Sequence, residues 1–315
     1  MEPNEQPDTA FAPHASSAPV TTASAATAAA AAAAPRPYIL PVDEEEDRRL
    51  DAQHDLLRDA LGSDFACPLG WAGAAPPRNV LDVGCGTGRW MRRAAERFPT
   101  ADIVGLDLRP PAPRGEALPP EIARRCLFAF ADLLAPLPLR DARFDYVHQR
   151  FLFAAVPAAR WPGLLGELAR VTRPGGWIEL VEGGIAAPAP GETAPAPCVT
   201  ALSAWTERLC LRRGIDLALP ARLPGLLARD PRVRVAAACA IPIPLGAAFG
   251  GGDLGARAAE NWLSARHHVR GAVLRASLAD ADEYDAALSA APAELAAVRC
   301  VWRIYVCYGQ RRGDA

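Results

Sequence analysis

The chain has 315 residues, half of them hydrophobic, and its 34 basic and 36 acidic residues give a formal net charge of −2. This composition allows a large folded core, and a charge so close to zero does not indicate a nucleic-acid partner. Every basic residue is arginine, so Schiff-base, pyridoxal and Walker-type phosphate chemistry, which need a lysine, are excluded. The eight cysteines form no Cys-x-x-Cys pair, which favours buried thiols in a reducing compartment over a metal site.

Residues 1–36 are rich in Ala, Pro, Ser and Thr and lack spaced large apolar side chains, which predicts a disordered tail. Their first basic residue is Arg36, so the segment is typical of neither a secretory signal nor a transit peptide. No later run of about 18 large apolar residues indicates a membrane span. We therefore expect a cytoplasmic protein.

Beyond the tail, acidic residues followed by spaced leucines predict a helix over 42–61 that stops at Gly62. Strand-like and helical patterns then alternate, which predicts an α/β fold with a parallel sheet covered on both faces. The predicted strands are 79–83, 102–106, 126–130, 144–148, 177–181, 233–245 and 301–308. The predicted helices are 90–98, 160–171 (ended by residues 174–176), a Leu/Ala-rich stretch from 197, 255–278 and 282–298.

Three glycines at alternate positions follow the first strand, in the order Asp82, Gly84, Gly86 and Gly88. Glycine is needed where a chain turns sharply out of a strand and its backbone approaches a ligand closely. A dinucleotide fingerprint places its third glycine three residues after the second, and Arg89 occupies that position here. The segment instead resembles motif I of the class I S-adenosylmethionine-dependent methyltransferases.

Further segments follow the order of that family from about residue 40 to the C-terminus. The resemblance implies a Rossmann-like, seven-stranded, mostly parallel sheet with added helices that form a lid, and S-adenosylmethionine as the cofactor. Residues 79–190 would form the cofactor-binding core. Residues 191–315 would form a helical acceptor region that contains the last two strands.

The family's pattern also suggests roles for residues at the strand ends. Asp107 ends the second strand, where a carboxylate can bind both ribose hydroxyls, and Leu108 follows it. By the resemblance, Asp132 would contact the adenine amine, and Leu133 would provide a backbone N–H. The expected cofactor-binding residues are Asp82, Gly84, Cys85, Gly86, Gly88, Asp107, Leu108, Asp132, Leu133, His148 and His54.

A narrower resemblance is carried by residues 47–54, by His148-x-Arg150 and by the string 175–180. Together they are similar to the subfamily that includes the fungal velvet-complex regulators of secondary metabolism and their bacterial relatives. In that subfamily the helix before motif I lies over the cofactor, so residues 37–78 would form a helical cap.

The ionisable residues leave alternatives open. His148 ends the fourth strand, where it could take a proton from a substrate hydroxyl or only hydrogen-bond the neighbouring loop. Glu182 is a weaker catalytic candidate. Asp82 could contact the cofactor or brace the glycine turn. His54 could face the methionine end of the cofactor, together with Gln53, or be a packed histidine.

Three polar residues of the helix predicted over 255–278 also have two readings. Asn261, His267 and His268 could line an acceptor pocket, but a solvated helical face is the favoured interpretation.

The function favoured by these patterns is transfer of a methyl group to a small-molecule acceptor, with O-methylation of a natural-product hydroxyl or carboxyl preferred. An alternative is a regulator that binds S-adenosylmethionine and acts through a protein partner, and a homo-oligomer stays open as well. A nicotinamide oxidoreductase is disfavoured by the Gly88 spacing and by Asp132. Neither a nucleic-acid nor a membrane partner is expected.

Overall fold

The computed structural model describes residues 38–69, 75–109 and 119–313. The tail predicted for residues 1–36 lies outside these described residues. The chain forms one seven-stranded sheet in the order β3-β2-β1-β4-β5-β7-β6. Every strand is parallel to its neighbours except β7, which is antiparallel to β5 and β6. The strands are β1 (Asn79–Val83), β2 (Asp102–Asp107), β3 (Cys126–Phe130), β4 (Phe144–Arg150), β5 (Thr172–Pro188), β6 (Val233–Leu245) and β7 (Cys300–Arg311).

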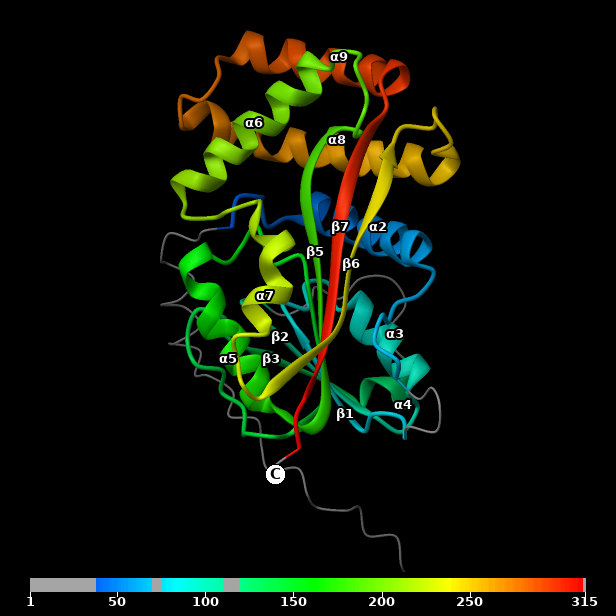
Figure 1. Ribbon diagram of the computed structural model, residues 1–315, viewed down its shortest axis with the longest axis vertical. Coiled ribbons are helices and arrows are strands. Elements are labelled where there is room, and N and C mark those ends of the chain that lie inside the picture. Colours follow the sequence, from blue (N-terminus) through cyan, green and yellow to red (C-terminus); the bar gives the residue numbers. More distant parts are fainter. Residues whose placement is uncertain (1–37, 70–74, 110–118, 314–315) are drawn as a thin grey trace, which may run out of the picture.

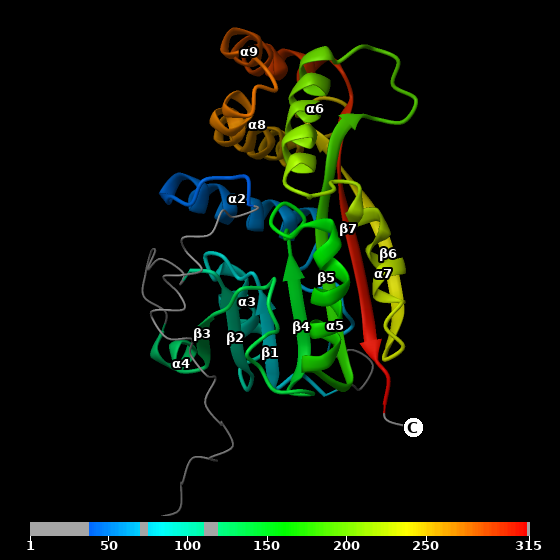
Figure 2. The same ribbon diagram turned by 90° about the vertical axis from the view of Figure 1, so that its left-hand side faces the viewer.

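Helices cover both faces of the sheet and form a separate layer beyond one end of it (Figures 1 and 2). The helices are α2 (Glu44–Leu61), α3 (Arg89–Arg97), α4 (Pro120–Ala123), α5 (Trp161–Val171), α6 (Pro197–Arg212), α7 (Leu223–Leu227), α8 (Gly252–Arg275) and α9 (Ala281–Ala297). Helix α3 packs on β1, β2 and β3, whereas α5 and α7 pack on β5, β6 and β7. This is the seven-stranded, mostly parallel Rossmann-like fold expected from the sequence.

Side chains of β1 alternate between the two faces of the sheet, so this strand contributes to the hydrophobic core on each face and also presents a carboxylate. Leu81 and Val83 are fully buried in the core beneath α5, and Val80 is fully buried in the core beneath α3. Because successive side chains of a strand point to opposite faces, Asp82 lies on the α3 side with Val80. Its strand thus places a carboxylate on that face one residue before β1 ends.

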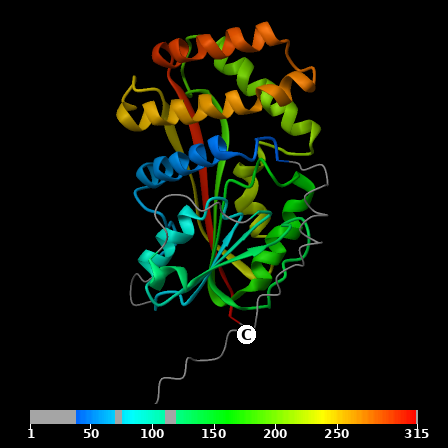
Figure 3. The same ribbon diagram turned by 180° about the vertical axis from the view of Figure 1, so that it is seen from behind.

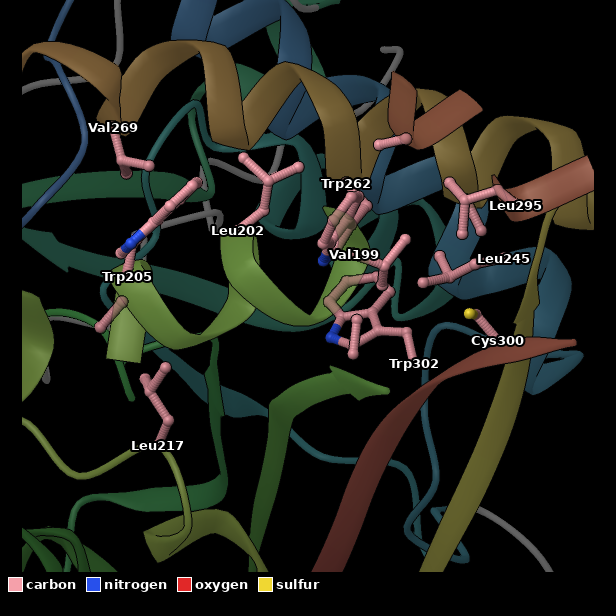
Figure 4. Packing of buried hydrophobic residues seen from close by; sticks show 14 of the residues in the cluster. Val199, Leu202, Trp205, Leu217, Leu245, Trp262, Val269, Leu295, Cys300 and Trp302 are labelled. Carbon is pink, nitrogen blue, oxygen red and sulfur yellow. The ribbon is translucent and has the colours of Figure 1, made fainter. Parts of the chain in front are cut away.

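Strands β5, β6 and β7 extend well beyond the other strands and carry the layer formed by α6, α8 and α9 (Figures 1 and 3). A large apolar core joins this layer to the strands. Figure 4 shows Trp262 of α8 and Trp302 of β7 projecting into that core beside Val199 and Leu202 of α6. Helix α2 lies between this layer and the edge of the sheet where β1 and β2 end (Figure 2).

Most predicted elements are confirmed within a few residues, and β1, β3 and β6 have the predicted bounds. The helix predicted over 160–171 is confirmed as α5, which ends at Val171. The start of the next strand was wrong: it was predicted over 177–181, after a stop at 174–176, but β5 already begins at Thr172, which pairs with Phe144 of β4. The register then shifts, and Gly175 has a φ of 77° in this irregular stretch, so the glycines shape a bulge in β5.

Glu182 lies within β5 and has no exposed surface. Its carboxylate accepts hydrogen bonds from the Gln149 side chain and from the backbone N–H groups of Leu152 (2.8 Å) and Phe153 (3.1 Å). Burial nonetheless raises the pKa of Glu182 to about 8, because the charged form loses its hydration. Glu182 therefore braces the turn that follows β4, where Phe151 has a φ of 57°.

This raised pKa predicts a pH-dependent stability. Between about pH 5 and 8 the folded protein retains a proton on Glu182 that the unfolded chain has released, so stability falls as the pH rises. Glu182→Gln should remove about 2–4 kcal/mol of this pH-dependent change in the free energy of unfolding. Urea unfolding at pH 5.5, 7 and 8.5 measures it. Glu283→Gln, at an exposed glutamate, is the control and should retain the wild-type pH dependence; a Glu182→Gln profile parallel to wild type would contradict the prediction.

Candidate active site

A cavity of about 280 Å³ lies at the carboxyl ends of β1, β2 and β4. The sheet order reverses between β1 and β4, and ligands of open α/β sheets bind at such a switch point. Ten of the residues expected to bind the cofactor line this cavity. They are His54, Asp82, Gly84, Cys85, Gly86, Asp107, Leu108, Asp132, Leu133 and His148.

The glycine turn forms the floor of the cavity. Gly84, Gly86 and Gly88 all have positive φ values, of 71°, 53° and 76°. A Cβ on Gly84 would lie 2.5 Å from the Leu152 side chain, whereas a Cβ on Gly86 would meet nothing within 4 Å. Since Gly86 lines the cavity, any side chain there would occupy the ligand's space. Gly88 does not line the cavity; it is the N-cap of α3.

Asp107 braces this turn. Its Oδ2 accepts a hydrogen bond from the Gly86 N–H at 2.9 Å, and its Oδ1 accepts one from the Arg109 N–H at 3.3 Å. Burial raises the pKa of Asp107, although these N–H groups favour its charged form. The bracing role weighed for Asp82 thus belongs to Asp107, and its oxygens keep lone pairs for ligand hydroxyls.

Asp82 and His148 are register partners on neighbouring parallel strands, so their side chains share one face. His148 Nδ1 lies 2.8 Å from Asp82 Oδ1, and both side chains are almost fully buried. Because an ionised carboxylate only accepts hydrogen bonds, the proton lies on Nδ1 and leaves Nε2 as the basic nitrogen. The Trp90 ring stacks on the imidazole with centroids 3.8 Å apart and planes 3° from parallel. The Asp82 carboxylate and the Trp90 ring together set the orientation of His148.

His54 is both a buried histidine and a wall of the cavity. Its Nδ1 lies 2.8 Å from Arg150 Nη2, and since a guanidinium only donates, Nδ1 must accept. Its Nε2 lies 3.3 Å from Asp64 Oδ1. Burial lowers the pKa of His54, so the neutral ring is favoured.

Three aspartates, four residues apart along α2, attach this helix to the glycine turn and its surroundings. The spacing places them on one helical face. The contacts are Asp47 with Arg109, Asp51 with the Thr87 hydroxyl (2.7 Å) and Asp55 with Arg89 (2.5 Å). Leu50, Gln53 and His54 of the same helix line the cavity, so α2 forms its roof.

The opposite side of α2 is bound to α8. Arg49 donates two hydrogen bonds to Glu46 (2.6 and 2.8 Å) and one to Asn261 Oδ1 (3.3 Å), and His268 Nδ1 lies 2.7 Å from Glu46. The solvated face favoured for the α8 residues was therefore wrong for Asn261, which is 6% exposed, and for His268, whose side chain is 7% exposed. It holds for His267, which is exposed.

A second, smaller cavity of about 90 Å³ lies between α2, α6, α8 and the extended strands β5 and β7. It shares a wall with the first cavity. The common residues are Tyr38, Leu40, Leu50, Gln53 and Phe151. Asn261 lines this second space.

Residues 80–176 match the family described as a methyltransferase domain. The fold, the glycine turn and this match show that the chain carries a class I methyltransferase domain, whose cofactor is S-adenosylmethionine. Both the resemblance and the cofactor expected from the sequence are confirmed.

Three similar curated proteins come from fungi. The N-methyltransferase sirN of Leptosphaeria maculans is 29% identical over 225 residues, which are 71% of this chain and 76% of that protein. The secondary metabolism regulator laeA of Aspergillus fumigatus is 37% identical over 148 residues, 46% of this chain and 36% of that protein. The N-methyltransferase verN of Clonostachys rogersoniana is 32% identical over 164 residues, 51% of this chain and 53% of that protein. The chain thus spans about a third to a half of the laeA and verN proteins.

Among solved structures, a putative sarcosine dimethylglycine methyltransferase from Galdieria sulphuraria is 13% identical, with a TM-score of 0.41; the match covers 75% of this chain and 78% of that one.

Within the described ranges, no helix combines the length and apolar character needed to cross a membrane.

The residues around the cavity fit the cofactor. The open space beside Gly86 admits a ligand against the backbone, and Asp107 offers acceptor oxygens for ribose hydroxyls. Asp132 is fixed at the turn after β3 because its Oδ1 accepts the Leu134 N–H at 2.9 Å. Its contact with adenine, and that of Leu133, stay predictions. The Cys85 thiol is nearly buried, and burial raises its pKa well above the ordinary value, so it is not a nucleophile.

Several lining side chains were not among the expected site residues, and three of them are Trp90, Arg150 and Thr87. Two of them lie beside recognised motifs, since Thr87 is inside the glycine turn and Arg150 follows His148 by two residues. Only the folded structure shows that Trp90 stacks on His148.

Removal of the Asp107 carboxylate should weaken cofactor binding. Asp107→Ala removes the acceptors for ribose and the brace on Gly86, so we expect the affinity for S-adenosylhomocysteine to fall about 10- to 100-fold. Calorimetric titration measures this effect. Asp102→Ala, at the exposed start of the same strand, is the matched control and should bind like wild type. Equal affinities for Asp107→Ala and wild type would remove Asp107 from the site.

Proposed function

We propose that this chain transfers a methyl group from S-adenosylmethionine to a small-molecule acceptor, with a hydroxyl oxygen as the favoured methylated atom. The observation that supports it is the pair of adjoining cavities. The larger one has the cofactor-binding turn and the Asp82–His148 pair, and the smaller one shares its wall and lies beneath the helical layer. An acceptor in the second cavity would face the cofactor across Gln53 and Phe151. A secondary metabolite suits the fungal relatives named after secondary metabolism.

When bound, S-adenosylmethionine supplies a methyl group on a positively charged sulfur, which is already activated to leave. The protein then contributes alignment and exclusion of water. Helix α2 closes the cavity from above, and its contacts with Thr87 and Arg89 hold it there. His148 Nε2 is free to take the proton that a hydroxyl acceptor loses, while Asp82 stabilises the imidazolium through Nδ1.

Turnover with a panel of phenols, alcohols and amines tests the proposed activity, with release of S-adenosylhomocysteine as the measurement. If no compound of the panel raised the release of S-adenosylhomocysteine above the rate measured without acceptor, the proposed small-molecule methyltransferase activity would be contradicted.

His148→Asn tests the base with an acceptor identified in that panel. The asparagine amide can replace Nδ1 as the donor to Asp82, but it lacks a basic nitrogen. We expect kcat to fall about 100-fold, with little change in the affinity for S-adenosylhomocysteine. His267→Ala, at an exposed position of α8, is the control. Unchanged turnover in His148→Asn would assign His148 a purely structural role.

The similarity to laeA supports a second candidate, a regulator that binds S-adenosylmethionine and works through a protein partner. Removal of residues 1–36 distinguishes the two proposals. If the regulator proposal is correct, the shortened chain should lose its partner in pull-downs. Partner-free turnover that does not depend on these residues would favour the enzyme.

A further inference from the structure

The second cavity contains an arginine whose charge no carboxylate neutralises in the described part of the chain. Arg266 of α8 lines this cavity and not the first one. Its Nε is buried without a hydrogen-bond partner among the described residues. The titratable groups that lie near it are Tyr284, Cys210 and Arg49, and none of them is a carboxylate. Its guanidinium carbon lies 4.6 Å from the centre of the Trp262 ring.

Two other arginines, one on α2 and one on α8, each form an ion pair with a carboxylate, which is the usual arrangement for this side chain. Arg49 of α2 is buried and pairs with Glu46 at 2.6 Å, and Arg270 of α8 pairs with Asp285 at 2.5 Å. Arg266 is half-buried, and withdrawing a guanidinium partly from water without such a partner is costly. Burial lowers the pKa of Arg266 to about 10, so the side chain is still charged at neutral pH. The cation is therefore maintained at the cavity at a cost in stability.

The rest of this cavity is mainly apolar. Trp262 and Trp302 lie on its walls, and Figure 4 shows both rings directed into the space between α8 and β7. The Ser203 and Thr206 hydroxyls already donate to the carbonyl oxygens of Ala186 and Leu202. A ligand that fits here has an apolar body and one group able to pair with a guanidinium.

We propose that the acceptor is an organic carboxylate with an aromatic or aliphatic body, anchored by an ion pair between its carboxylate and Arg266. A planar carboxylate matches the donor pattern of a guanidinium. Because Arg266 does not line the cofactor cavity, the carboxylate is the anchor, and the methylated atom lies at the other end, near Gln53 and Phe151. This inference rests on the proposed methyltransferase function.

The test uses the full chain saturated with S-adenosylhomocysteine. Phenylacetate, indole-3-acetate and the uncharged amide of each are titrated separately into it, and ligand-observed NMR measures their binding. We expect the wild type to bind each carboxylate about tenfold or more tightly than its amide. Arg266→Gln should abolish this preference, and Arg266→Lys should retain part of it. Arg270→Gln, which removes a paired arginine one turn along α8, should behave as wild type.

The affinity of every variant for S-adenosylhomocysteine is measured in parallel, which shows whether the fold and the cofactor cavity are intact. If Arg266→Gln does not fold, the comparison of Arg266→Lys with wild type decides the result. Cofactor binding without a preference for carboxylates, or a preference that survives in Arg266→Gln, would overturn the anion site alone. A wild-type chain that fails to bind S-adenosylhomocysteine would refute the proposed function, and this inference with it.

Discussion

The two cavities depend on the position of α2, which polar contacts hold on both sides. Asp47, Asp51 and Asp55 tie one face to the glycine turn and the segments beside it, and Glu46 and Arg49 tie the other face to α8. Without this helix the larger cavity would have no roof and the smaller one would lose a wall. The face formed by Asp47, Asp51 and Asp55, to which the sequence pattern assigned no role of its own, therefore holds the roof of the site in place.

The fold was predictable because its signals are local. Alternating strand and helix patterns gave all seven strands, and the glycine spacing identified the cofactor turn. The site residues that sequence reasoning found are those at strand ends, since the carboxyl ends of parallel strands must meet at one edge. Asp107, Asp132 and His148 all reach the cavity for this reason. The early start of β5 was missed because a Pro-Gly-Gly bulge in a strand resembles a helix stop in sequence.

Other features depend on contacts between distant segments and leave no local signal. The pairing of Asp82 with His148 follows from strand register, which a sequence pattern does not specify. Trp90 reads as an ordinary core residue until its stacking on His148 is seen. Likewise, Arg266 is one of 34 basic residues in the sequence, and its lack of a carboxylate partner is visible only when the surrounding helices are in place.

The extended strands β5, β6 and β7 have a mechanical consequence. They run from the cofactor sheet into the layer of α6, α8 and α9, and backbone hydrogen bonds join them along this length, apart from register shifts at 183–186 and 235–237. Bending between the sheet and the helical layer would have to break many of these interstrand hydrogen bonds at once. Helix α2, in contrast, is held to the turn below and to α8 above by side-chain contacts. Displacement of α2 would therefore break these side-chain contacts and leave the backbone ladders of the strands intact as a stiff frame.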